Sequence, residues 1–174
     1  MIKRLAIFLF LFLILTAPVL AQEKYATPSA VKYELPFPGM LPDHPLYKLK
    51  VLRDKITLFL IRDPQKKTEY HLMLADKRIQ MANILVDKGK IELAKETALK
   101  GEHEYTLIIF MLKDENKKPS KESFNRLEKA ALKHQEVLNG ILAKVADKDK
   151  KTFLTVIYFS KKNADELKTI YNTY

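Results

Sequence analysis

The chain has 174 residues, which is enough for one ordinary domain with or without a targeting segment and too few for two large domains. Hydrophobic residues make up 47% and charged residues 30%, which excludes a collagen-like repeat and a wholly disordered chain. The absence of Cys excludes disulfides, thiol catalysis and Cys-based zinc sites. The four Gly leave no glycine-rich phosphate loop and favour helices over a β-sandwich with many tight turns.

The first 21 residues follow the order of a secretory signal peptide. Lys3 and Arg4 precede an uncharged apolar run over residues 5–17, which is shorter than the ~20 residues that span a bilayer. We predict cleavage after Ala21, which removes Lys3 and Arg4 and reduces the net charge from +10 to +8. The signal peptide directs this basic chain to the periplasm, the cell envelope or the extracellular space. The alternative is an uncleaved N-terminal anchor, which Pro18 disfavours because proline breaks a helix.

Residues 22–44 predict an extended, proline-rich arm. Six of the eight Pro lie between Pro28 and Pro64, and the segment shows no helical periodicity. Its apolar side chains alternate with Pro and Gly, so we expect the arm to turn and to lie on the folded part. These features divide the chain into a signal peptide (1–21), an arm (22–44) and a helical domain (45–174).

Helix start signals begin at residue 43. Asp43 or His44 is placed to cap a helix with Pro45 in its first turn, and Asp63 is placed to cap a helix that begins with Pro64. Further caps are expected at Ser120 and Asp147, and a left-handed helix end at Gly89.

Apolar residues between these signals recur every three or four positions, which is the spacing of one helical face. The pattern covers residues 72–86, 91–112, 124–145 and 153–171. It predicts an all-α fold in which four main helices with short connections pack as an antiparallel bundle. Many Ala on the second and third of these helices, together with Gly101, predict a close approach between those two.

A shorter basic helix is predicted before the bundle, from Pro45 to Ile61. Its five basic side chains and one acid give a net charge of +4 through residue 62, and residues 58–61 are apolar on every side. We expect the bundle and the arm to cover such a helix on more than one face. The alternative is a helix over residues 46–62 that binds an anionic membrane or envelope polymer weakly. The residues that would make this contact are Lys48, Lys50, Arg53, Lys55 and Arg62.

Several motifs in the first half of the chain resemble a known family. Residues 33–50 read YELPFPGMLPDHPLYKLK and are followed by RDKI at 53–56, DP at 63–64 and ADKR at 75–78. These motifs resemble a family of exported bacterial helical proteins, the domain of unknown function DUF5667. The resemblance covers roughly residues 33–105, and the segment LPDHPLYKLK is its most specific part. It implies a helical, extracytoplasmic protein without assigned catalytic residues.

No catalytic, cofactor or metal site is predicted. None of the four His follows a Glu by three positions, so the Glu-x-x-His pairs of a di-iron bundle are absent, and no serine-nucleophile motif occurs. Glu102, His103 and Glu104 form the densest cluster of acidic and histidine residues in the sequence. Successive helical residues point in different directions and cannot surround one ion, so we expect these side chains to lie on a solvated surface. His134 occupies an apolar seam position, where we expect a satisfied core histidine, with a ligand role as the alternative.

Nucleic acid is disfavoured as a partner, because the 31 basic residues comprise 26 Lys and only 5 Arg without interleaved aromatic residues. Lysines of this kind solvate the outer faces of a bundle or are attracted to anionic lipid or polymer. We therefore predict an exported, noncatalytic binding or structural module of the cell envelope with a protein or envelope partner. A carboxylate or histidine metal enzyme is a further hypothesis, which the lack of ligand spacing disfavours.

Overall fold

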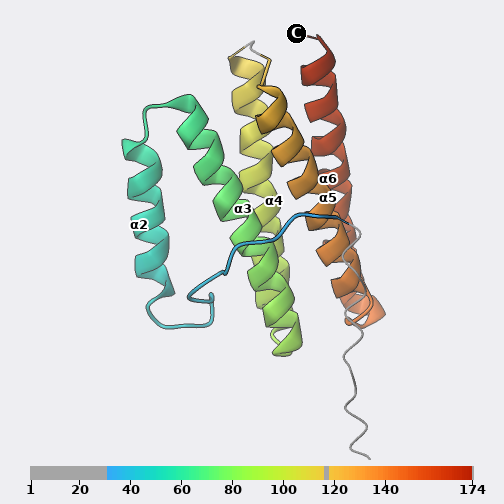
Figure 1. The fold of residues 1–174 in the computed structure, drawn as a ribbon. Helices are drawn as coiled ribbons and strands as arrows, with labels where there is room; N and C mark the ends of the chain where they lie inside the picture. Colours follow the sequence, from blue (N-terminus) through green and yellow to red (C-terminus); the bar gives the residue numbers. More distant parts are fainter. Residues whose placement is uncertain (1–30, 116–117, 174) are drawn as a thin grey trace, which may run out of the picture. The chain divides into compact units, whose positions relative to one another are not determined.

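Five helices make up most of the part of the chain that the structure describes, and no strand occurs there. The structure is a computed structural model and describes residues 31–115 and 118–173. In chain order the helices are α2 (Tyr47–Leu60), α3 (Pro64–Asp87), α4 (Ile91–Asp114), α5 (Lys121–Leu142) and α6 (Asp147–Thr173) (Figure 1). The predicted all-α class is confirmed. The predicted signal peptide and the first part of the arm lie outside the described residues.

Side-chain caps explain where several helices begin. Asp63 accepts a hydrogen bond of 2.9 Å from the backbone N–H three residues later, and Pro64 is the first residue of α3. Ser120 accepts the equivalent bond of 3.1 Å at the start of α5. Both predicted caps are confirmed. The predicted left-handed helix end after α3 is also confirmed, because Gly89 has a φ of +71°. Asp147 is the first residue of α6 rather than its cap.

The predicted start of the basic helix is wrong. α2 begins at Tyr47, so Pro45 precedes the helix, and its N-cap residue is Leu46, which makes no side-chain cap. Asp43 is engaged elsewhere, because its carboxylate pairs with Lys88 and Lys90 at 3.1 and 2.8 Å. His44 Nδ1 accepts a hydrogen bond of 3.1 Å from a backbone N–H in the turn that precedes α2.

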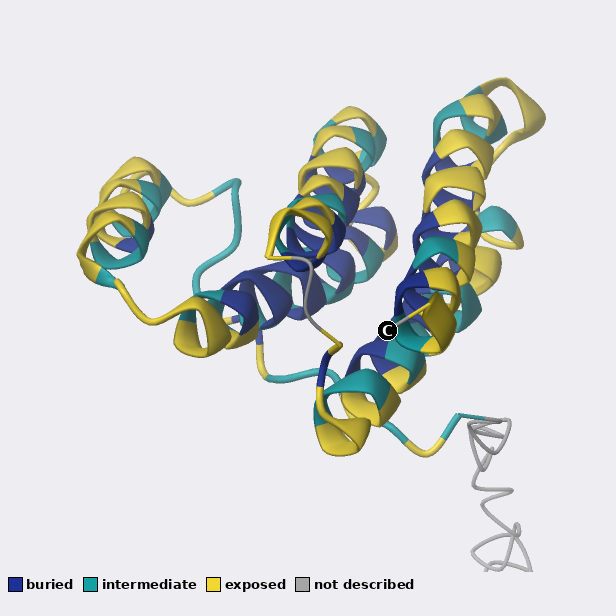
Figure 2. Ribbon diagram, turned by 90° about the horizontal axis from the view of Figure 1, so that it is seen from above, coloured by how far each residue is buried: buried dark blue, intermediate teal, exposed yellow. Residues whose placement is uncertain are grey.

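Helices α3 to α6 pack side by side (Figures 1 and 2). Direct contacts join α3 to α4, α4 to α6, α6 to α5 and α5 to α3. In Figure 1 the chain runs down α3, up α4, down α5 and up α6. Two helical hairpins, α3–α4 and α5–α6, therefore lie against each other.

The predicted close approach between the helices at 91–112 and 124–145 is wrong, because α4 packs most extensively against α3 and not against α5. Gly101 of α4 faces α3. A Cβ atom added at Gly101 would lie 3.1 Å from the Cβ of Arg78 and 3.2 Å from Cδ1 of Ile79. The missing side chain thus allows α4 to lie close to α3.

Two groups of buried apolar side chains form the core between these four helices. The first contains Tyr105 and Leu167, and the second contains Leu138 and Phe153. Each group draws on α3, α4, α5 and α6, so removal of apolar surface from water holds all four helices together.

The described part of the arm runs without helix from residue 31 to α2. Tyr33 packs against the first core group, and its hydroxyl donates a hydrogen bond of 2.6 Å to Asp76 of α3. Farther along, the Lys50 ammonium of α2 donates to the carbonyl oxygens of Pro38 and Met40 at 3.0 and 3.2 Å. The arm therefore contacts both the packed helices and α2.

Candidate functional site

A cluster of charged and polar side chains lies inside the packed helices. His134 of α5 is completely buried, and its Nε2 lies 2.8 Å from Oδ1 of Asp76 on α3. On the other side of the ring, Nδ1 lies 3.8 Å from Oε2 of Glu102 on α4. Asn163 of α6 donates a hydrogen bond of 2.7 Å to the other Glu102 oxygen. The imidazole of His134 is thus placed between two buried carboxylates.

These carboxylates hold His134 in its protonated form. Burial by itself lowers the pKa of His134, but the hydrogen bond with Asp76 and the nearby charge of Glu102 outweigh burial and raise the pKa to about 9. One imidazolium then offsets part of the charge of two carboxylates. Within the described residues, Nδ1 of His134 and Oε2 of Glu102 have no hydrogen-bond partner, so they attract each other as charges.

A second buried group lies between α3 and α4. Nδ1 of His71 lies 2.6 Å from Oε2 of Glu104, and the Arg78 guanidinium pairs with the other carboxylate oxygen. Burial raises the pKa of Glu104, but the hydrogen bonds from His71 and Arg78 outweigh it and leave that pKa below its usual value.

The prediction that Glu102, His103 and Glu104 form a solvated surface is therefore wrong for both acids. Only His103 is exposed, whereas Glu102 and Glu104 are buried. The physical reason is that α4 packs against α3 and α6 at once, so two directions on α4 point inward. No sequence signal indicates that Glu102 and Glu104 are buried, because the partners of these acids come from other helices.

The geometry of the His134 cluster does not suit a metal ion. Asp76 and Glu102 approach opposite nitrogens of the ring, so their oxygens do not converge on one point. Among the residues that the structure describes, no group of three or more His, Asp or Glu could hold an ion. The cluster instead joins α3, α4, α5 and α6 through one buried network.

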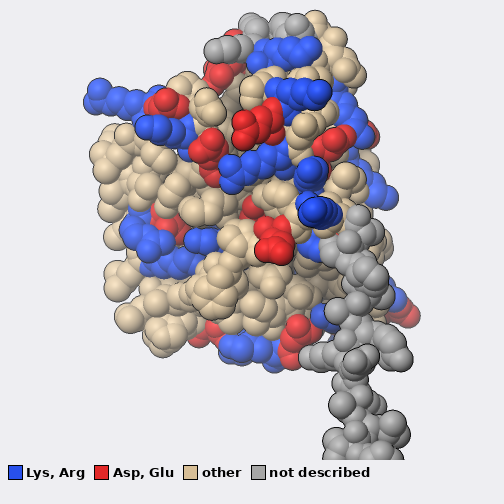
Figure 3. All heavy atoms as spheres, viewed as in Figure 1, with Lys and Arg blue, Asp and Glu red and all other residues tan. Residues whose placement is uncertain are grey.

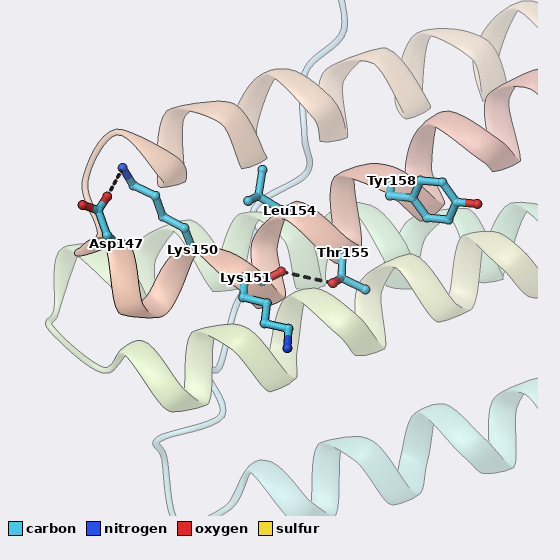
Figure 4. A pocket seen from close by; sticks show the side chains of 6 residues that line it. All are labelled: Asp147, Lys150, Lys151, Leu154, Thr155 and Tyr158. Atoms are coloured by element: carbon cyan, nitrogen blue, oxygen red, sulfur yellow. Dashed lines mark hydrogen bonds and ion pairs between the residues drawn. The ribbon is translucent and has the colours of Figure 1, made fainter.

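An open pocket lies on α6 (Figure 4). All its lining residues belong to that helix, and polar groups among them already pair with each other. Lys150 lies 2.7 Å from Asp147, and the Thr155 hydroxyl donates to the Lys151 carbonyl at 3.1 Å. The pocket brings together no nucleophile and base. Its lining residues are Asp147, Lys150, Lys151, Leu154, Thr155 and Tyr158.

Helix α2 offers a different kind of surface, because it contacts the rest of the protein on one side only. Its Tyr47 hydroxyl lies 3.9 Å from Sδ of Met81, and the Tyr70 hydroxyl donates to Asp54 at 3.2 Å. Asp54 is the one buried residue of α2. In Figures 1 and 2, α2 stands at the edge of the arrangement, beside α3.

The opposite side of α2 is apolar and exposed. Leu49, Leu52, Ile56 and Phe59 follow one another at intervals of three, four and three residues, so they share one helical face. Leu49 is 63% exposed and Phe59 is 86% exposed. The α2 apolar face is defined here as Leu46, Leu49, Leu52, Ile56, Phe59 and Leu60.

The expectation that this helix is covered on more than one face is therefore wrong. Of the apolar run at its end, only Leu58 and Ile61 turn toward the protein and are half-buried. Phe59 and Leu60 turn away from it. The physical reason is that the arm and α3 both contact α2 on the side that carries Lys50 and Asp54.

The structure separates the five basic residues predicted to contact an anionic surface. Lys48, Arg53, Lys55 and Arg62 are exposed, whereas Lys50 is half-buried and bound to the arm. Partial burial lowers the pKa of Lys50, in keeping with this inward position. Over α2, Figure 3 shows an uncharged surface with Lys and Arg side chains above and below it.

The described helices include none that is long and apolar enough to cross a membrane.

Comparison with known proteins identifies a family. A family model described as a domain of unknown function (DUF5667) matches residues 39–148, from the arm to the start of α6. The resemblance seen in the sequence motifs is confirmed. Searches of curated proteins and of solved structures found no match.

Proposed function

The chain belongs to the DUF5667 family, and we propose that it is an exported, noncatalytic module of the cell envelope that docks to an envelope partner. In this proposal the docking surface is the α2 apolar face. Helices α3 to α6 act as an antiparallel four-helix bundle that supports α2, and the proline-rich arm ties α2 to it. Export is inferred from the signal-like residues 1–21.

One observation carries the docking proposal, namely five large apolar side chains exposed on one face of α2, together with Leu46 at its N-cap. Large contiguous apolar patches are rare on monomeric soluble proteins and mark interaction sites when they occur. The core between α3 and α6 forms without these side chains, so packing among the described residues does not account for them.

The noncatalytic part of the proposal is supported by the way polar groups are used. The buried acids and histidines pair with one another between helices, and the α6 pocket pairs its own polar groups. A pocket at the starts of α3 and α5 contains Asp63 and Ser120, but both side chains cap these helices.

Site-specific photocrosslinking in living cells tests docking. A photoreactive amino acid replaces Phe59 on the α2 apolar face, and a control probe replaces Phe110, which is 60% exposed on α4. We expect the probe at residue 59 to crosslink to an envelope component, lipid or protein, and the control to do so far less. Equal crosslinking at both positions, or none at residue 59, would contradict the proposal.

A further inference from the structure

We propose that the partner of the α2 apolar face is the surface of an anionic lipid bilayer, on which α2 lies parallel to the membrane plane. This inference rests on the proposed docking function and names its partner. It depends on three features of α2: its apolar face, the charges beside that face and the position of α2 in the fold.

Basic side chains border the apolar face on both edges. Lys48 and Lys55 are seven residues apart and therefore lie on the same edge of the apolar face. This edge borders Leu52 and Phe59. Arg53 lies on the other edge, beside Leu49 and Leu60 on the helical wheel. An apolar face with cationic edges is the pattern of helices that lie in the membrane interface.

The one acid of α2 offsets only the charge of Arg53. Asp54 is buried, pairs with Arg53 at 2.6 Å and accepts a hydrogen bond from Tyr70. Asp54 makes no ion pair with Lys48 or Lys55, so their edge of the apolar face keeps its charge. The exposed side of the helix is therefore cationic, and this complements a surface of anionic headgroups.

A second copy of the chain fits this surface poorly. Two α2 apolar faces placed together would bring Lys48, Arg53 and Lys55 of each copy near the same cations of the other. Like charges along such a contact repel, and the chain carries a formal net charge of +10, or +8 after the predicted cleavage.

A soluble anionic polymer also fits less well than a bilayer. It would attract the lysines, but it would leave Leu52 and Phe59 in water. A bilayer interface accepts the apolar side chains among its acyl chains and the lysines at its headgroups. The arm and α3 contact α2 from the other side, so the apolar face is open to a flat surface.

Tryptophan fluorescence tests the inference directly, because the sequence contains no Trp. The exported protein carrying Phe59→Trp is mixed with phosphatidylglycerol vesicles, with phosphatidylcholine vesicles or with dextran sulfate. We expect a blue shift of the emission with phosphatidylglycerol vesicles only. The matched variant Phe110→Trp, also exposed on a helix, should show no shift. The readout is local to α2, so it does not depend on whether the N-terminal segment is cleaved.

Substitutions on the apolar face and on its Lys48 and Lys55 edge give a quantitative check by vesicle titration. Phe59→Asp should weaken binding to phosphatidylglycerol vesicles by at least about tenfold, whereas Phe110→Asp should not change it. Lys48→Glu combined with Lys55→Glu should weaken binding by about fivefold or more for each lysine. The same exchange at Lys148 and Lys151 of α6 should weaken it by less than about threefold in total.

Three results would overturn the lipid inference: no shift at residue 59, an equal shift at residue 110, or an equal shift with phosphatidylcholine. The crosslinking experiment then separates the two proposals. If the probe at residue 59 captures an envelope protein in place of lipid, the docking function stands and the lipid inference is wrong. If it captures nothing, both are wrong.

Discussion

His134 carries its charge inside the protein because two acids from other helices flank its ring. Asp76 contacts one nitrogen, and Glu102 lies beside the other. Tyr33 of the arm donates a hydrogen bond to Asp76, and Asn163 of α6 donates one to Glu102. Removing one member of such a network leaves an unpaired buried charge, so the network couples four helices and the arm.

We expect the free energy of unfolding to decrease as the pH rises from about 6.5 to about 9. The folded protein raises the pKa of His134 from 6.5 to about 9, so it binds the proton more tightly than the unfolded chain does. The stabilisation of the folded state by the proton on His134 is complete below pH 6.5 and is lost as the pH rises through 9. It amounts to about 3 kcal/mol, which urea unfolding at a series of pH values measures.

The control for this experiment is His134→Gln. The variant should be less stable than the native protein at pH 6, and its stability should change little up to pH 9. An unaltered pH dependence in this variant would assign the titration to another group.

Gly101 and Gly140 provide a matched test of helix contact. At Gly101 a Cβ would lie 3.1 Å from the Cβ of Arg78, an atom held by its own backbone, whereas at Gly140 nothing lies within 4 Å. Gly101→Ala should therefore destabilise the protein by about 1 to 3 kcal/mol, despite a better helix propensity. Gly140→Ala should stabilise it by up to about 1 kcal/mol. Thermal unfolding of both variants measures the difference, and equal effects would contradict the close approach of α3 and α4.

At the scale of elements, the same three-and-four spacing has two different outcomes. On α5 the seam residue Leu138 is completely buried between helices, whereas on α2 the equivalent pattern is exposed. Spacing determines that apolar side chains share a face, but it does not determine whether another element covers that face.

Leu138→Ala tests the buried seam. We expect a loss of about 2 to 5 kcal/mol in the free energy of unfolding, because the substitution leaves a cavity in the second core group. Lys129→Ala, at an exposed position of the same helix, should cost less than about 0.5 kcal/mol. Lys133 is a poorer control, because its side chain is 14% exposed and pairs with Glu136. Similar losses from both variants would contradict the seam on α5.

Two phenylalanines compare the exposed face of α2 with the core. Phe59→Ala should change the free energy of unfolding by less than about 0.5 kcal/mol, because this side chain is 86% exposed. Phe153→Ala should cost about 3 to 5 kcal/mol, because Phe153 is completely buried. Chemical denaturation measures both. A large loss from Phe59→Ala would mean that the α2 apolar face stabilises the fold and is not free to dock.

At the scale of the whole molecule, the described helices α3 to α6 form two helical hairpins, with α2 beside α3. This arrangement leaves one edge helix whose outward side is covered by no other described element. The proposed export and the proposed contact with lipid both concern the N-terminal third of the chain, where the signal-like segment, the arm and α2 follow one another.

Processing of the exported protein is the prediction at this scale. Because Val19 and Ala21 flank Leu20 at the end of the apolar run, we expect signal peptidase to cleave after Ala21. N-terminal sequencing of the exported protein should then begin at Gln22. A protein that keeps Met1 and fractionates with membranes would support the N-terminal anchor instead.

The sequence by itself determined the helical class, the positions of α3 to α6 and the caps at Asp63 and Ser120. These depend on the spacing of apolar residues along the chain and on hydrogen bonds to the next turn. The motifs at residues 33–78 were also enough to indicate the family.

Only the tertiary structure decided which helices touch and which faces stay open. The partners of His134 come from Asp76 and Glu102, which lie 58 and 32 residues away in the chain, and no local pattern links them. The exposure of Phe59 likewise depends on where the arm and α3 contact α2. Both are long-range outcomes, because burial is set by the elements that pack together and not by the spacing within one element.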